Sequence, residues 1–236
     1  MSSPAASASL TDLQAPVRDR LEGVTPEIRR IVEADFPLIR EINGHLLQMR
    51  GKMFRPMLLL LADGATDGHN ARGVTLAAIL ELIHLATLVH DDAVDHSVLR
   101  RGMPTINALF SHQVSVIMGD YLYSRAVVEL VALRDLDALD VVGRVTNDMT
   151  IGEMRQLLAH DGLAFTESAY DLLIRSKTAS LLAWACEVGA LGARPEQRAA
   201  LRRFGEELGM AFQIVDDLLD YAGDASETGK PVGGDL

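Results

Sequence analysis

An all-α fold is the first prediction from this sequence of 236 residues, and three observations support it. Apolar residues recur at helical spacing through most of the chain, as in Leu76, Ile79, Leu80 and Ile83. Strict alternation of apolar and polar residues over the length of a strand is scarce. Hydrophobic residues make up 48% of the chain, which is enough to bury a large core. We therefore expect one large helical bundle, a single domain over residues 1–236.

The expected helices are separated by short breaks that carry Gly, Asp or Pro. These breaks lie at 63–73, 102–104, 160–162, 192–195 and 223–234. The helices expected over 75–89 and 180–191 are apolar around much of their circumference, which is typical of helices enclosed by others. A further helix is expected over 120–133. Residues 1–10 are small and polar without a signal-peptide pattern, so we expect a disordered tail there.

The composition argues against some classes of protein. Acidic residues outnumber basic ones by 33 to 22, and the net charge of -11 argues against a nucleic-acid partner. The single cysteine, Cys186, stands in an apolar stretch, which predicts a buried side chain and a reducing, cytoplasmic setting. The apolar stretch 76–89 contains Glu81 and His84 and is shorter than the ~20 residues of a membrane span, so we expect no transmembrane segment.

The pattern Asp-Asp-x-x-Asp occurs twice, each time after an apolar helical run. The first cluster is Asp91, Asp92 and Asp95, and the second is Asp216, Asp217 and Asp220. Carboxylates at the C-terminal end of a buried helix repel one another and the helix dipole, so they require a compensating cation. Mg²⁺ prefers such oxygen ligands and completes its shell with phosphate oxygens and water. Two facing clusters could clamp one diphosphate; the alternative, a solvated acidic helix end, is commoner for a lone Asp-Asp pair.

Basic residues stand where an anionic ligand would need them. Lys52 and Arg55 are three residues apart, on one face of the helix that we expect to follow. Arg100 and Arg101 follow the first cluster, and we expect the glycine and proline at 102–104 to end its helix. Arginine forks suit phosphate oxygens. The first pair alone is weak evidence, since Lys and Arg at a helix start are more often ordinary surface residues than ligands.

Several further motifs accompany these residues in order along the chain. They are Gly-Lys-x-x-Arg-Pro at 51–56, the stretch 81–95, Arg-Arg-Gly-Met-Pro-Thr at 100–105, Gly-Glu-x-x-Gln at 152–156, Lys-Thr at 177–178, Phe-Gln at 212–213 and Gly-Lys-Pro at 229–231. With both aspartate clusters, they resemble the trans-type isoprenyl diphosphate synthases, or polyprenyl synthetases, over about residues 44–236. The resemblance implies a helical bundle of the isoprenoid synthase type around a deep central cavity, usually as a homodimer.

The resemblance also implies roles for individual residues. The six aspartates would bind up to three Mg²⁺ ions, with Mn²⁺ as an alternative. The allylic diphosphate would bind through these ions and through Arg100, Lys177, Thr178, Gln213 and Lys230. Isopentenyl diphosphate would bind to Lys52, Arg55, His84 and Arg101. The catalytic residues would be Asp91, Asp92, Asp95, Lys177 and Asp216.

Without the resemblance, some of these residues have ordinary interpretations. By spacing alone, His84 would be a core histidine, Lys177 a surface lysine and Gln213 a buried amide. Glu153 and Gln156 either support the metal shell or pair with neighbours.

The implied reaction is a prenyl transfer. Magnesium ions and basic side chains stabilise the charge that develops on the leaving diphosphate, so that the allylic C–O bond ionises to a carbocation. The double bond of isopentenyl diphosphate attacks this cation. Loss of a proton, with the departing diphosphate as the base, then gives a product five carbons longer.

Product length is expected to depend on the residues one helical turn before the first cluster. They are Ala86 and Thr87, where short-chain members of the family commonly carry an aromatic residue that blocks the growing chain. Val127 and Val128 on the next expected barrier are modest in size. We therefore expect a product longer than fifteen carbons, a long chain of the kind used for quinone side chains.

The sequence departs from the family pattern at three places. Met53 stands where many members carry Arg, and His96 where Glu is common. The chain ends at Leu236, where members usually continue, so the C-terminal helices are expected to be lacking. Two alternatives stay open: a terpene cyclase or head-to-head synthase of the same fold, and a non-catalytic or regulatory subunit of a heteromeric synthase. Both intact aspartate clusters favour chain elongation.

Overall fold

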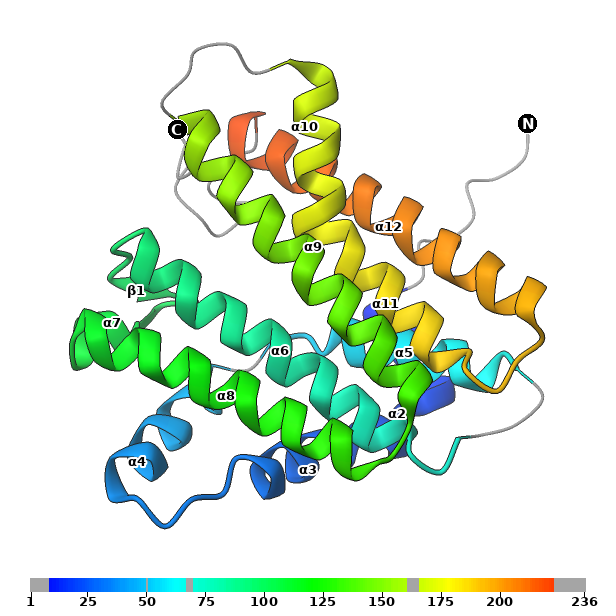
Figure 1. The fold of residues 1–236 in the computed structure, drawn as a ribbon, viewed down its shortest axis with the longest axis horizontal. Helices are drawn as coiled ribbons and strands as arrows, with labels where there is room; N and C mark the ends of the chain where they lie inside the picture. The colour runs from blue at the N-terminus through cyan, green and yellow to red at the C-terminus, as the bar shows by residue number, and fades with distance from the viewer. Residues whose placement is uncertain (1–8, 50, 67–69, 161–165, 223–236) are drawn as a thin grey trace. The chain divides into compact units, whose positions relative to one another are not determined.

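The structure is a computed structural model that describes residues 9–49, 51–66, 70–160 and 166–222. In these ranges the chain is almost entirely helical, which confirms the predicted fold class (Figure 1). The chain forms two compact units, Met1–Leu136 and Asp137–Leu236, and each is described by itself. A single domain with a central cavity stays a prediction.

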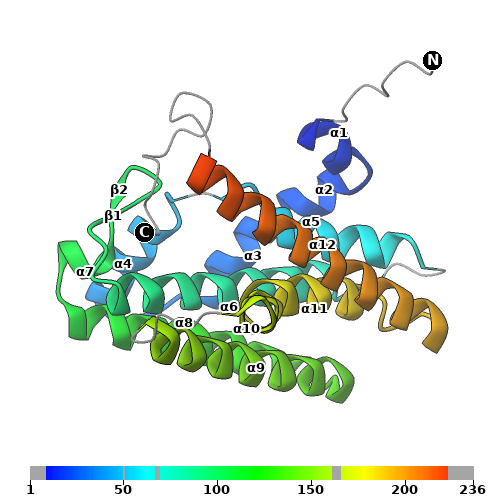
Figure 2. The same ribbon diagram turned by 90° about the horizontal axis from the view of Figure 1, so that it is seen from above.

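The first unit is built around one long helix. Its elements are α1 (Leu10–Gln14), η1 (Ala15–Val17), α2 (Arg18–Glu22), α3 (Val24–Ile31), α4 (Pro37–Leu46), α5 (Phe54–Gly64), α6 (Gly73–Val94), β1 (Leu99–Arg100), β2 (Met103–Pro104), α7 (Ile106–Leu109) and α8 (His112–Ala132). Helices α3, α5 and α8 pack against α6, and α8 lies alongside it over much of its length (Figure 2). Because α6 is covered on several sides, its apolar residues form the centre of this core.

Burial explains why α6 is so apolar. Ile79, Leu80, Leu82 and Ile83 are at most 1% exposed. Among the described helices, α6 is the one that is long and apolar enough to cross a membrane, but 56% of its most apolar stretch is buried inside the protein. This is the pattern of a core helix.

The second unit consists of α9 (Leu136–His160), α10 (Glu167–Ile174), η2 (Arg175–Ala179), α11 (Ser180–Gly189) and α12 (Pro195–Ala222). Helix α11 and the π-helix η2 pack against α12. Two glycines on α12 permit close contact, since a Cβ at Gly205 would lie 2.4 Å from the carbonyl oxygen of Leu182, and one at Gly209 would lie 2.5 Å from Cα of Ala179. Cys186 is buried in α11, as predicted, and burial raises the pKa of its thiol to about 12.

The predicted breaks at 63–73 and 192–195 both separate helices, and the helix expected over 120–133 is the second half of α8. Residues 223–234 lie outside the described residues, as does most of 160–162. The expectation of a buried helix before the second cluster is wrong, because Phe212, Ile214 and Val215 are exposed on α12.

Candidate active site

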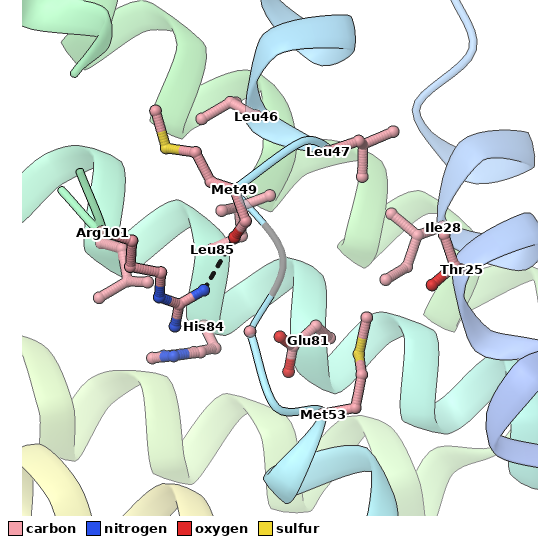
Figure 3. A pocket seen from close by; sticks show the side chains of 12 residues that line it. Thr25, Ile28, Leu46, Leu47, Met49, Met53, Glu81, His84, Leu85 and Arg101 are labelled. Carbon is pink, nitrogen blue, oxygen red and sulfur yellow. Dashed lines mark hydrogen bonds between the residues drawn. The ribbon is translucent and has the colours of Figure 1, made fainter. Parts of the chain in front are cut away.

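A pocket in the first unit is lined by two of the predicted basic residues, His84 and Arg101 (Figure 3). It is lined by α3, by the segment that follows α4, by α6 and by the turn between β1 and β2. Its ionisable side chains are Glu81 and His84, one helical turn apart on α6, and Arg101 from the hairpin turn. The remainder of its wall is mainly apolar, with Ile28, Leu46 and Leu85 among the lining residues.

A tight hairpin, not a helix, carries the arginine pair. The helix of the first cluster ends at Val94, so the expectation that it continues to 102–104 is wrong. Arg101 and Gly102 form the two-residue turn between the strands, with φ of 52° and 74°. Positive φ at both central residues matches the twist of the flanking strands, and glycine adopts it without strain.

The hairpin directs Arg101 into the pocket. Arg101 Nη1 donates a hydrogen bond of 2.8 Å to the carbonyl oxygen of Met49, drawn as a dashed line in Figure 3. The guanidinium also lies against Gly51, where a Cβ would be 3.0 Å from Nη1. Gly51 of the predicted Gly-Lys-x-x-Arg-Pro motif therefore makes room for Arg101.

Arg55 and His84 form the second half of the basic group. Arg55 Nη1 donates to His84 Nε2 at 3.1 Å, and because a guanidinium can only donate, the hydrogen of the neutral ring lies on Nδ1. Burial, and then the charges of Arg55, Arg101 and Arg100, lower the pKa of His84 well below 6.5. Arg55 Nε is buried without a hydrogen-bond partner in the described part of the chain. Arg55 thus keeps one unused donor behind His84, which lines the pocket.

Glu81 moderates this positive charge. Burial raises the pKa of the Glu81 carboxyl, and the charges of Arg55 and Arg101 partly oppose that shift. The expectation that Lys52 and Arg55 share a helical face is wrong. Helix α5 begins only at Phe54, after Met53 in a left-handed conformation (φ 51°), so Lys52 lies outside the helix. Lys52 is exposed at the edge of this region, and its carbonyl oxygen accepts a hydrogen bond from Gln14.

The first aspartate cluster stands at the C-terminal end of α6, as predicted. Asp92 is buried, and Arg100 Nε lies 2.8 and 3.0 Å from its two carboxylate oxygens. Burial raises the pKa of Asp92, and Arg100 acts against this. Asp91 is half-buried and Asp95, which caps the helix, is exposed. Asp91 and Asp95 share a helix face as residues i and i+4.

The second aspartate cluster lies in the last turns of α12, within the second unit. Asp216 is exposed, whereas Asp217 accepts hydrogen bonds from Gln213 Nε2 at 2.7 Å and from the Tyr170 hydroxyl at 2.5 Å. Thr178 donates in turn to Gln213 Oε1 at 2.7 Å. This connects α10, η2 and α12 at the cluster.

The π-helix η2 carries the predicted Lys-Thr pair. Lys177 Nζ lies 2.9 Å from a Glu153 oxygen and donates to Gln156 Oε1 at 2.9 Å, both on α9. Thr178 contacts α12 instead. In the structure, Glu153 and Gln156 therefore pair with a neighbour, Lys177.

The acidic side chains offer magnesium some of its ligands but no complete cage. No group of three acidic, histidine or cysteine side chains in the described ranges is arranged to hold a metal by itself. Mg²⁺ rarely uses an all-protein cage and commonly takes one or two carboxylates together with substrate phosphates. The pairs Asp91 with Asp95, and Asp216 with Asp220, fit that mode.

Some predicted residues are not placed at either site. Lys230 lies outside the described residues. Ala86 is 2% exposed, and the Thr87 hydroxyl donates to the carbonyl oxygen of His84, so their role in chain length stays a prediction.

Two contributors were not singled out from the sequence. Glu81 could have been found from its i, i+3 spacing to His84, but no local pattern connects Tyr170 with Asp217.

A family model and curated relatives indicate the same protein family for this chain. The family description "Polyprenyl synthetase" matches residues 36–236. The octaprenyl diphosphate synthase of Escherichia coli is 39% identical over 92% of this chain and 68% of its own length.

Solved structures of similar proteins indicate the same family. A decaprenyl diphosphate synthase from Rhodobacter capsulatus superposes with a TM-score of 0.90 at 40% identity, over 96% of this chain and 71% of its own. A polyprenyl synthase from Caulobacter crescentus, solved with calcium and isoprenyl diphosphate, superposes with a TM-score of 0.92 at 35% identity, over 98% of this chain and 71% of its own. On these matches, the chain belongs to the polyprenyl synthetase family.

Proposed function

We propose that the protein is a prenyltransferase, which condenses isopentenyl diphosphate with an allylic diphosphate and releases a trans-polyprenyl diphosphate longer than fifteen carbons. One observation carries the proposal: helix α6 presents a basic pocket and an acidic cluster on the same face. His84 and Asp91 are residues i and i+7 of α6, and Asp95, at i+11, is its C-cap residue; a helix of 3.6 residues per turn aligns these positions.

The spacing suits two diphosphate groups that must meet. At 1.5 Å per residue, His84 and Asp91 are about 10.5 Å apart along the helix axis. A diphosphate bound at the basic pocket would therefore leave a five-carbon chain extending toward the acidic cluster. The basic pocket binds an anion directly, whereas the acidic cluster can bind one only through a cation.

Magnesium is the cation that the donor set favours, in up to three ions, with Mn²⁺ as an alternative. Asp91 and Asp95 would bind it in the first unit, and Asp216 and Asp220 in the second. When bound, it would supply positive charge to the leaving diphosphate. A calcium ion accompanies isoprenyl diphosphate in the Caulobacter relative, which supports a divalent metal.

The side chains of the protein position both substrates. Arg55, Arg101 and the Nδ1–H of neutral His84 would bind isopentenyl diphosphate, with exposed Lys52 at the edge. Arg100, Lys177, Thr178 and Gln213 would bind the allylic diphosphate, with Lys230 as a further predicted contact. The allylic C–O bond then breaks, its electron pair leaves with diphosphate, and the isopentenyl double bond attacks the cation. The proton lost from the new cation passes to diphosphate.

The residues before the first cluster leave room for a long product. Ala86 and Thr87 offer no bulky barrier, which supports a long chain of the kind used for quinone side chains. Long-chain synthases among the relatives support this. A homodimer is proposed, because α8 exposes Ile117, Val128 and Val131 at 55% or more and such a surface suits a second copy. A cytoplasmic location is proposed from the single cysteine, which is buried.

The test is to incubate the purified protein with magnesium, isopentenyl diphosphate and farnesyl diphosphate and to measure product lengths by mass spectrometry. A ladder that continues beyond twenty carbons is expected. Arg55→Met removes the forked donor but keeps an unbranched side chain, and it should raise KM for isopentenyl diphosphate by about ten- to a hundredfold. No consumption of isopentenyl diphosphate by the wild type would refute the proposal. Light scattering on the same sample tests the homodimer.

A further inference from the structure

The second aspartate cluster is held by a continuous set of hydrogen bonds. The Thr178 hydroxyl donates to Gln213 Oε1, Gln213 Nε2 donates to Asp217 Oδ1, and the Tyr170 hydroxyl donates to Asp217 Oδ2. The three donor–acceptor distances are 2.7, 2.7 and 2.5 Å. Both oxygens of Asp217 therefore accept a bond from the protein.

The direction of each bond determines how the Gln213 amide lies. Because the Asp217 carboxylate can only accept, the NH₂ group of Gln213 is directed at it and Oε1 is left to accept from the Thr178 hydroxyl; reversing the amide would place two acceptor oxygens against each other. Asp216 lies about 100° around the helix from Asp217, and it remains exposed. Asp217 is thus tied to the protein, while Asp216 is presented to a ligand.

We propose that Tyr170 is a positioning residue for the second aspartate cluster: its hydroxyl fixes Asp217, and through Asp217 the Gln213 amide, in the orientation that receives the allylic diphosphate and its magnesium. The role given to that ligand rests on the proposed function. Tyr170 itself is on α10 and would act through Asp217 and Gln213, without touching the ligand.

The environment keeps Tyr170 a donor. Burial and the hydrogen bond to Asp217 raise the pKa of its hydroxyl to about 12, so the proton stays on the tyrosine at neutral pH. A hydrogen bond to a charged acceptor is among the stronger bonds in proteins. Losing it leaves the last turns of α12 attached to α10 by fewer contacts.

The experiment compares Tyr170→Phe with Tyr121→Phe. Each substitution removes one hydroxyl that donates a hydrogen bond, but Tyr121 donates to the carbonyl oxygen of Val32, in the first unit. The first readout is binding: the inorganic diphosphate concentration, at fixed magnesium, that gives half of the maximal rise in the unfolding temperature. Tyr170→Phe should require about tenfold more diphosphate, and Tyr121→Phe an unchanged amount.

The second readout is kinetic. Tyr170→Phe should lower kcat/KM for farnesyl diphosphate by about tenfold and change KM for isopentenyl diphosphate by less than twofold. A merely structural role would affect both substrates alike. Equal behaviour of the two tyrosine variants in binding and kinetics would overturn the inference. A weakened diphosphate binding in Tyr170→Phe supports it even if the wild type makes no product, which would refute only the proposed function.

The double variant Tyr170→Phe with Thr178→Val tests whether the bonds act as one chain. Valine keeps the shape of Thr178 and removes the hydroxyl that orients Gln213. If both residues act through Gln213 and Asp217, the double variant should bind diphosphate about as weakly as the weaker single variant. Losses that multiply would contradict a shared chain.

Discussion

At the scale of single residues, His84 shows how neighbours set a protonation state. Arg55 donates to its Nε2, and burial together with three arginines lowers its pKa. A protonated ring would lose the hydrogen bond and face positive charge at close range. His84 therefore acts as a neutral donor through Nδ1, a role that a glutamine amide could also fill.

The lowered pKa of His84 predicts a pH dependence of stability. As pH falls below 6.5, the unfolded chain binds a proton at residue 84 before the folded chain does, so the free energy of unfolding decreases. The slope is at most about 1.4 kcal/mol per pH unit. Glu81 has a raised pKa, so above pH 4.5 it has the opposite effect on the free energy of unfolding. This effect is common to the wild type and to a His84→Gln variant, which both contain Glu81. Urea unfolding should show that His84→Gln loses less stability between pH 6.5 and 5 than the wild type. Parallel profiles would contradict the assignment.

A second residue-scale prediction concerns product length. Ala86 is one turn before the first cluster, where we expect the growing chain to pass. Ala86→Phe should shorten the product ladder measured by mass spectrometry, since an aromatic ring occupies the space that further isoprene units need. Ala200→Phe is the matched control, because Ala200 is exposed on α12 and a ring there can remain in solvent. An unchanged ladder in Ala86→Phe would mean that the chain runs elsewhere.

At the scale of elements, α6 and α8 meet at a glycine beside the first cluster. A Cβ at Gly119 would lie 2.3 Å from His90 Nε2. The same nitrogen is 3.1 Å from the carbonyl oxygen of Val116 and 3.3 Å from a carboxylate oxygen of Asp120. His90 adjoins Asp91 in sequence, so the fit of two helices fixes the backbone that carries the metal ligands.

Gly119→Ala should therefore disturb both stability and metal use. The histidine ring must move, which we expect to cost about 1–3 kcal/mol and to raise the magnesium concentration needed for half-maximal activity. Gly143→Ala is the matched control on α9: its Cβ meets nothing within 4 Å, and alanine should raise helix stability by up to ~1 kcal/mol. Chemical unfolding and a magnesium titration measure both effects. If Gly119→Ala matched the control in both, the contact would be unimportant.

At the scale of the whole molecule, metal binding depends on substrate more than on the fold. The described chain has no group of three ligands that could bind a metal alone. Removing magnesium with a chelator should abolish turnover and leave the unfolding temperature unchanged. Magnesium and diphosphate added together should raise that temperature well beyond either alone. A large effect of the chelator on the protein without substrate would indicate a structural metal site.

The sequence predicted what depends on local pattern. Helical periodicity predicted the all-α fold, and the repeated aspartate pattern placed the first cluster at the end of α6. It could not predict the hairpin of Arg100 and Arg101, since two strands of two residues are too short for a periodic signal. Nor could it predict the contact of Tyr170 with Asp217, because pairing across 47 residues depends on how helices pack.

The π-helix η2 has a consequence for how this chain can be altered. Its wider turn, closed by the bond from Ser180 N–H to the carbonyl oxygen of Arg175, contains one residue more than an α-helical turn would. Deleting any one of residues 175–179 would restore a regular helix in which the residues inside the turn face other directions, while those after it keep about their present angle. Lys177 and Thr178 could then no longer reach α9 and α12 together. Chimaeras between relatives should therefore take this segment whole from one parent, with crossover points placed outside it.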